Sequence, residues 1–251
     1  MSIDQLAETA RAMVAAGKGI IAIDESNNTI KKRFDGVGIE CTEENRRAYR
    51  ELLLTTPKLG DYISGAILYD ETLRQKTKAG VPFAEVMRKA GIIPGIKVDK
   101  GPVALAGFPG EVVTEGLDGL RDRLKEYAQL GARFAKWRAV ITIGEDAPSG
   151  TCIEANSHAL ARYAALCQEA GIVFLSGGQS DEQATAHLDA MNRMGGLPWP
   201  LSFSYGRAMQ SAALQLWSKD IANNIAAAQQ TVYARAKDNG LAALGKWTKA
   251  A

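Results

Sequence analysis

Two lysines interrupt apolar runs that otherwise have the composition of buried strands. Lys97 lies in GIKVD and Lys136 in FAKWR, each near the point where its run becomes polar. Asp24, Asp99 and Arg138 lie at comparable points, which favours an inward-facing charged cluster. A lysine there can hold an anionic substrate or, with a lowered pKa, act as an acid, a base or an amine nucleophile. The ordinary alternative is a lysine that reaches solvent or forms a structural salt bridge.

A second group of residues has the composition of a phosphate site. Ser176, Gly177 and Gly178 follow an apolar run and precede a helical pattern. Glycines let backbone N–H groups approach an anion, and the helix N-terminus attracts negative charge. Arg207 ends the next apolar run as SYGR. The alternative is a plain turn between a strand and a helix.

Strands and helices alternate along the chain with no linker, which predicts parallel strands joined by helical crossovers. Polar residues follow almost every expected strand, and this favours a barrel over an open doubly wound sheet. No G-x-G-x-x-G follows the first strand. Expected strands cover residues 20–26, 62–71, 92–101, 134–141, 172–178 and 201–207, and expected helices cover 3–16, 42–54, 83–91, 116–131, 154–171, 181–194 and 208–244.

The composition excludes several classes of function. The 251 residues are 46% hydrophobic with a net charge of +2, so no nucleic-acid or membrane partner is indicated. The three cysteines are far apart and fit neither a disulfide framework nor a zinc site. Both histidines lie in helical patterns, and no metal-binding or cofactor motif occurs, so we expect neither metal nor cofactor. The N-terminus has no apolar leader, so a cytoplasmic protein is expected.

Long stretches of the chain together resemble the class I fructose-1,6-bisphosphate aldolases. They include GKGIIAIDES, ECTEENRRAYRELLLTT, GIKVDKG, NSHALARYAALCQEAGI, FLSGGQSDEQATAHL and PWPLSFSYGRAMQ. The resemblance implies a (β/α)8 barrel, usually a homotetramer. It also implies cleavage of fructose 1,6-bisphosphate to dihydroxyacetone phosphate and glyceraldehyde 3-phosphate through a lysine Schiff base, without metal.

The resemblance assigns roles to the residues singled out above. Asp24 in IDES resembles the acidic residue beside the Schiff base, and Lys136 resembles the lysine that assists carbinolamine chemistry. Lys97 and Arg138 resemble residues that handle the far phosphate and the hydroxyls. The phosphate on the ketose end would be bound by Ser176, Gly177, Gly178 and Arg207.

Two motifs of the family are absent from this sequence. The family carries Glu-Pro-Glu on its fifth strand and the Schiff-base lysine, in a context like L-x-K-x-x-M-V, on its sixth; neither occurs here. The chain passes from QEAGIV directly to FLSGGQ, so we expect an internal deletion with its join at about residues 171–173. One barrel domain of about six strands is predicted over residues 1–251, with a helical tail from about 208.

The missing lysine predicts that aldolase activity is lost or severely reduced, because no amine remains at that position to form the iminium. Two alternatives stay open: a non-catalytic sugar-phosphate-binding pseudoenzyme, and a truncated product without function. The sequence does not decide the oligomeric state, because the missing units could have supplied an interface.

Overall fold

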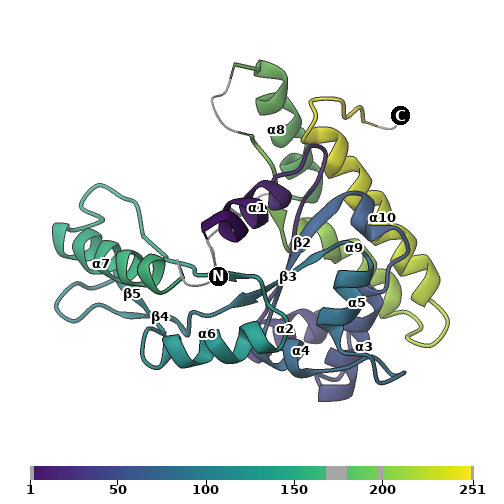
Figure 1. The fold of residues 1–251 in the computed structure, drawn as a ribbon, viewed down its shortest axis with the longest axis horizontal. Coiled ribbons are helices and arrows are strands. Elements are labelled where there is room, and N and C mark those ends of the chain that lie inside the picture. Colours follow the sequence, from purple (N-terminus) through teal and green to yellow (C-terminus); the bar gives the residue numbers. More distant parts are fainter. Residues whose placement is uncertain (1–2, 168–179, 197–199, 250–251) are drawn as a thin grey trace.

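A curved parallel sheet forms the centre of the protein (Figure 1). The computed structural model describes residues 3–167, 180–196 and 200–249. Within these ranges the sheet has five strands in the order β6-β3-β2-β1-β7, all parallel. Their bounds are β1 Gly19–Ile23, β2 Ile63–Leu68, β3 Ile93–Lys97, β6 Phe134–Lys136 and β7 Ser204–Tyr205.

The strand order has the topology of a barrel. Strands β1, β2, β3 and β6 pair side by side in the order in which they occur along the chain, and β7 returns to pair with β1 through Ile20 and Ser204. A doubly wound sheet would reverse direction at β1 and place helices on both faces. A single winding that returns to its first strand is the arrangement of (β/α)8 proteins. Within the described residues β6 and β7 are the two ends of the sheet, so this part of the barrel is open.

Helices cover the outer face of the sheet and enclose the main apolar core. Phe34, Tyr49 and Trp217 pack against one another there, with ring centroids 5.4–6.2 Å apart. The helices are α1 Ile3–Met13, α2 Asn27–Asp35, α3 Glu43–Leu54, α4 Asp70–Arg74, α5 Phe83–Lys89, α6 Leu120–Gln129, α7 Gly150–Cys167, α8 Asp181–Met194, α9 Arg207–Trp217 and α10 Ile225–Ala242, with a 3-10 turn at Leu59–Asp61.

A smaller apolar cluster fills the concave face of the sheet. Phe134 of β6 packs there with Ile20, Ile67 and Met13. The ring of Phe134 crosses the neighbouring strands at two glycines, and a Cβ atom on Gly95 would lie 2.2 Å from the ring carbon Cζ. The small residues on β2 and β3 therefore make room for one large side chain from β6. This interdigitation fixes the lower layer of the barrel interior.

Most sequence-predicted elements are present, with shifted ends. The Thr42 hydroxyl accepts a hydrogen bond from the Asn45 N–H at 3.1 Å, as a cap at the start of α3 requires. The expected helical tail is two helices, α9 and α10. The Asp220 carboxylate accepts hydrogen bonds from the backbone of Ala222 and Asn223 between them, and such local bonds compete with helix formation.

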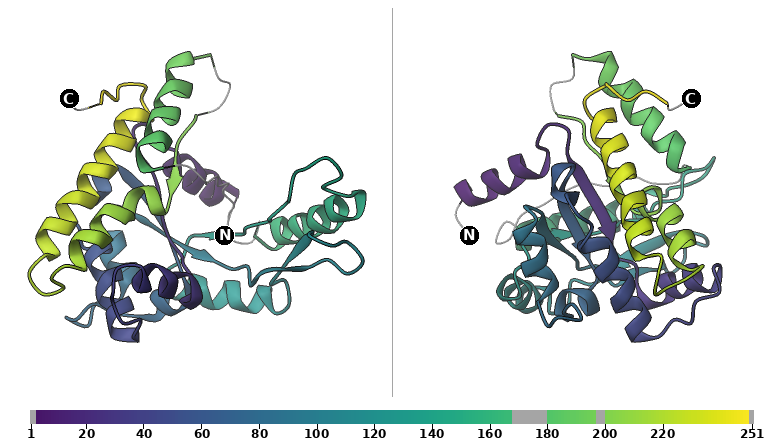
Figure 2. Two further views of the ribbon diagram at one scale, coloured as in Figure 1. Left: turned by 180° about the vertical axis from the view of Figure 1, so that it is seen from behind. Right: turned by 90° about the vertical axis from the view of Figure 1, so that its right-hand side faces the viewer.

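The region after β3 differs from the expectation. The strand expected over 92–101 ends at Lys97, and an antiparallel hairpin follows, formed by β4 (Gly101–Ala104) and β5 (Val112–Glu115). Glycines at the two bends allow this departure: Gly101 has φ +99°, and Gly116 has φ +129°. Figure 2 shows the hairpin and α7 extending together to one side of the sheet. The available signal for this hairpin was the set of turn-forming residues Gly107, Pro109 and Gly110 between two short runs that contain valine.

Two expected strands are shorter in the structure, and one helix that the sequence did not predict is present. The strand expected over 134–141 has three residues, and that over 201–207 has two. Helix α2 was not expected, because its sequence NNTIKKRFD buries only Ile30 and Phe34. The strand expected at 172–178 and the join at 171–173 lie outside the described residues. No helix within the described ranges is both long and apolar enough to cross a membrane.

The Phe134 contacts predict a stability effect. Phe134→Ala should lower the free energy of unfolding by about 3–5 kcal/mol, because the space above Gly65 and Gly95 would be left empty. Ile143→Ala is a control, because Ile143 is 86% exposed and its truncation should change the free energy by less than about 0.5 kcal/mol. Denaturant unfolding of both variants measures the difference. Equal effects would show that Phe134 does not fill the barrel interior.

Candidate active site

The candidate side chains come from three strands and the loops that follow them. Asp24 follows β1, Lys97 ends β3 and Lys136 ends β6. Lys97 and Lys136 are register partners in adjacent parallel strands, so both side chains leave the sheet on the same face. The carboxyl ends of the strands meet there, which is where barrels place their binding residues.

Lys136 and Asp24 meet across the concave face. The Lys136 Nζ lies 2.8 Å from Asp24 Oδ2, and the two side chains are only 9% and 12% exposed. Strands β2 and β3 separate β6 from β1, and three inter-strand spacings in a flat sheet would place the strands about 14 Å apart. The contact therefore requires a strongly curved sheet. The curvature of a barrel persists although the described strands do not close.

Lys97 is paired with a nearer carboxylate. Its Nζ lies 2.7 Å from Asp99 Oδ1 and donates to the Asp99 carbonyl oxygen at 2.7 Å. The other carboxylate oxygen of Asp99 accepts a hydrogen bond from the Arg138 N–H at 3.2 Å. Asp99 thus joins the loop after β3 to the loop after β6. The Arg138 side chain is exposed.

The second predicted group is only partly described. Arg207 is the exposed first residue of α9. The turn before it lies against the end of β1, because a Cβ atom on Gly206 would be 3.3 Å from the Ala22 carbonyl oxygen. Ser176, Gly177 and Gly178 lie outside the described residues, so the phosphate site that they would form with Arg207 remains a prediction.

Sequence analysis missed a buried ion cluster directly beside Asp24. Glu25 points to the opposite face of the chain from Asp24 and is ion-paired with Arg33 and with Arg50, whose Nη2 lies 2.6 Å from Glu25 Oε2. Gln210 of α9 donates to Glu25 Oε1 at 3.2 Å and to the Ala22 carbonyl oxygen at 2.6 Å. The available signal was Arg50, a charge on the buried face of α3.

This cluster determines the ionisation of Glu25. Burial by itself would raise the pKa of Glu25, but the positive charges of Arg50 and Arg33 outweigh burial and lower that pKa below its usual value of 4.5. The carboxylate therefore stays charged and ties the end of β1 to α2, α3 and α9. Asp24 lies directly before Glu25 in the chain, so the contacts of Glu25 also fix the backbone position of Asp24.

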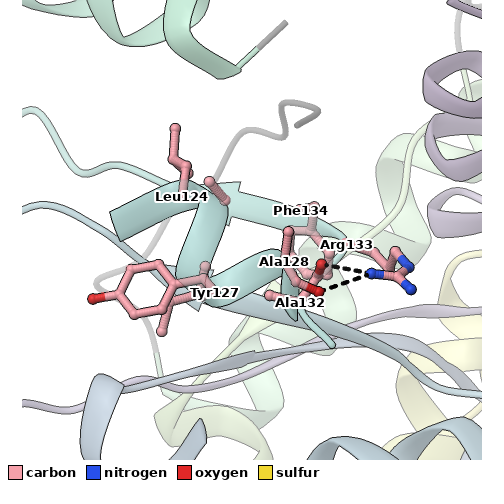
Figure 3. A pocket seen from close by; sticks show the side chains of 8 residues that line it. Leu124, Tyr127, Ala128, Ala132, Arg133 and Phe134 are labelled. Atoms are coloured by element: carbon pink, nitrogen blue, oxygen red, sulfur yellow. Dashed lines mark hydrogen bonds between the residues drawn. The ribbon is translucent and has the colours of Figure 1, made fainter. Parts of the chain in front are cut away.

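A cavity elsewhere is too small to be the substrate site. It has a volume of about 10 Å³ and lies where α6 packs on β3 and β6, which is room for about one water molecule. Figure 3 shows Arg133 at its edge, donating hydrogen bonds to the carbonyl oxygens of Ala128 and Ala132. The lining is otherwise almost entirely apolar, so this is a gap in packing. Its position on the helix side of the strands separates it from Lys136.

Both histidines lie on helices. His158 on α7 and His187 on α8 are both exposed. Within the described ranges, no three His, Cys, Asp or Glu side chains are grouped as a metal site would require. The three cysteines are free thiols, and burial raises the pKa of Cys167 to about 11.

The fold and the strand-end charges define an α/β-barrel protein whose polar residues collect at the carboxyl ends of the strands. The family model for class-I fructose-bisphosphate aldolase (Glycolytic) matches residues 5–173 and 169–251. A probable fructose-bisphosphate aldolase class 1 of Xanthomonas campestris pv. campestris is 60% identical over 332 residues, covering 98% of this chain and 99% of the relative. The chain therefore belongs to the class I fructose-bisphosphate aldolase family, whose members are lyases.

More distant relatives agree with this assignment. The cytosolic fructose-bisphosphate aldolase 4 of Arabidopsis thaliana is 42% identical over 315 residues, covering 91% of this chain and 80% of the relative. The fold is similar to a fructose-bisphosphate aldolase from Plasmodium falciparum, solved in complex with TRAP and a small-molecule inhibitor. The TM-score is 0.94 at 38% identity, with 98% of this chain and 96% of the other covered.

The comparisons agree with the expected internal deletion. The alignment with the Xanthomonas protein is 332 residues long although this chain has 251, so part of the relative has no counterpart here. The family model matches in two pieces that overlap at residues 169–173, and the join was predicted at about residues 171–173. The fold is accordingly that of the (β/α)8 family in an incomplete form.

The Lys136–Asp24 pair predicts a non-additive stability effect. Lys136→Met should lower the free energy of unfolding by about 3 kcal/mol, because it leaves the Asp24 charge buried and unpaired. The double variant Asp24→Asn/Lys136→Met should be more stable than the sum of the single effects predicts. Urea unfolding of Asp24→Asn, Lys136→Met and the double variant measures this coupling. The control is Lys31→Met, which breaks an exposed ion pair with Asp35 on the same helix and should change the free energy of unfolding little. If the effects of Asp24→Asn and Lys136→Met simply add in the double variant, the prediction is wrong.

The lowered pKa of Glu25 predicts a dependence of stability on pH. A carboxyl with a lowered pKa in the folded state stabilises the protein above its unfolded pKa, and this stabilisation is lost as pH falls through the folded value. The difference in unfolding free energy between the wild type and Glu25→Gln should therefore be largest near neutral pH and shrink below about pH 4.5. Chemical unfolding from pH 7 to pH 3 measures it, and parallel curves would contradict it.

Proposed function

We propose that the chain is a class I aldolase by descent that binds a sugar phosphate but has lost, or nearly lost, Schiff-base catalysis. The observation that carries the proposal is the state of Lys136: its ammonium is buried and paired with Asp24 at 2.8 Å. No L-x-K-x-x-M-V or Glu-Pro-Glu motif occurs in the sequence. The amine that remains is therefore occupied by its contact with Asp24.

The chemistry of the family explains why such an amine is inactive. A lysine must be neutral to attack the substrate carbonyl, and the resulting carbinolamine must lose water to give the iminium that accepts electrons as the carbon–carbon bond breaks. An opposite charge within hydrogen-bonding distance favours the protonated form of a lysine. Displacement of the reacting atom by one or two ångströms adds a further large cost. Lys136 is therefore proposed to bind a substrate hydroxyl beside Asp24 and not to form the Schiff base.

The phosphate-binding residues are proposed to retain their family roles. Lys97 and Arg138 would contact the phosphate far from the carbonyl and the hydroxyls, whereas Ser176, Gly177, Gly178 and Arg207 would hold the phosphate on the ketose end. Exposed guanidinium groups at Arg138 and Arg207 support this proposal, since both can form paired hydrogen bonds with phosphate oxygens. We propose a cytoplasmic location, in line with the cytosolic relatives.

Trapping of a Schiff base tests the catalytic half of the proposal. The purified chain is incubated with dihydroxyacetone phosphate and sodium borohydride, and its intact mass is measured. We expect no adduct, because the Lys136 amine is buried and engaged with Asp24. The probable aldolase of Xanthomonas campestris serves as the positive control. An adduct that is lost in Lys136→Met would refute the proposed inactivity and identify Lys136 as the nucleophile.

Thermal unfolding with fructose 1,6-bisphosphate tests the binding half in the same preparation. A binder should gain thermal stability with increasing ligand, and Arg207→Met should reduce the gain. A chain that unfolds cooperatively but gains nothing would not be a sugar-phosphate binder. A preparation that is never monodisperse or folded would support the truncated, non-functional alternative.

A further inference from the structure

Asp99 is the carboxylate that joins the two cations assigned to the far phosphate. Its side chain is 2% exposed, and it contacts Lys97 with one oxygen and the Arg138 N–H with the other. Lys97 ends β3 and Arg138 lies in the loop after β6, so a single buried carboxylate sets their relative positions. A buried carboxylate without partners would be costly, and here both oxygens are satisfied.

The Arg138 backbone is fixed on both sides, while its side chain is free to act. The Arg138 N–H donates to Asp99, and its carbonyl oxygen accepts from the Thr114 hydroxyl at 2.8 Å. Arg138 itself is exposed, and its guanidinium makes no recorded contact within the described part of the chain. A fixed backbone with a free cationic tip suits an anion that arrives from solvent.

The side chain of Lys97, unlike that of Arg138, is already paired. Its ammonium is held at 2.7 Å by the Asp99 carboxylate and at 2.7 Å by the Asp99 carbonyl oxygen, and its side chain is only 16% exposed. The pair is electrically neutral, so Lys97 contributes little attraction to a distant anion. Before it can bind a phosphate, it must give up or share the contact with Asp99.

We propose that Asp99 is a positioning residue that sets the phosphate affinity of this site by neutralising Lys97 while aligning Arg138. The inference rests on the proposed binding of a phosphate by Lys97 and Arg138, and it concerns the strength of that binding. Asp99 lowers the affinity that the two cations would otherwise have. A phosphate must displace the Asp99 carboxylate from Lys97, so the phosphate binds more weakly and dissociates faster than it would without Asp99.

Binding of inorganic phosphate by isothermal titration calorimetry tests the inference in full-length chains. All proteins carry Arg207→Met, so that the second predicted phosphate site does not contribute. Asp99→Asn keeps the shape of the side chain and one acceptor for the Arg138 N–H but removes the charge. It should bind phosphate roughly tenfold more tightly, with a steeper dependence on salt. A merely structural role for Asp99 would weaken binding.

Two variants make the result specific. Lys97→Met should weaken phosphate binding, and Lys97→Met/Asp99→Asn should bind phosphate less tightly than Asp99→Asn alone, because the cation that Asp99 neutralises is gone. Glu111→Gln removes a negative charge from another buried carboxylate, which contacts Ser149, and should leave the phosphate affinity unchanged.

The outcomes separate the inference from the proposed function. If Lys97→Met weakens binding but Asp99→Asn does not strengthen it, the inference is wrong and the proposed function stands. If the Arg207→Met protein binds no phosphate and Asp99→Asn does not restore binding, the proposed role of Lys97 and Arg138 fails together with the inference. If Glu111→Gln increases the phosphate affinity as much as Asp99→Asn does, the increase reflects only the change in net charge, and the inference is wrong.

Discussion

The contact between Lys136 and Asp24 is the constraint on which the rest of this molecule depends. It joins the last residue of β6 to the residue after β1, and two strands lie between them. Complete barrels keep their curvature because the hydrogen-bonded sheet closes on itself. In the described part of this chain that closure is absent, and the curvature is accompanied by an ion pair in the upper layer and by the packing of Phe134 in the lower one.

The same contact links stability to the proposed loss of catalysis. An unpaired ammonium in the barrel interior would be expensive, so an incomplete barrel is more stable when each interior lysine has a carboxylate partner. Lys136 has Asp24, and Lys97 has Asp99. Both lysine amines are therefore occupied by contacts with a carboxylate. In the proposed function, the pairing that supports the open sheet favours binding over covalent chemistry.

A buried cluster around Glu25 fixes the end of β1 from the helix side of the sheet. Glu25 faces the helices and is tied to Arg33, Arg50 and Gln210, whereas its neighbour Asp24 faces the barrel interior. Alternation of side chains along an extended segment is the reason that two adjacent acids have different surroundings. All members of this cluster come from the N-terminal part of the chain and from α9, so the cluster forms without the segment that the relatives have in addition. It fixes the strand end from which Asp24 reaches Lys136.

The sequence by itself determined the parallel strands, the barrel family, the main helices and the place of the join, because these depend on local periodicity and on long motifs. It also located the lysines at the strand ends. It did not determine the β4–β5 hairpin, the cluster around Glu25 or the partners of the lysines. Glu25 and Arg50 are 25 positions apart, and Asp24 and Lys136 are 112 apart. Only the tertiary structure decides such pairings, because the curvature of the sheet sets which distant side chains meet.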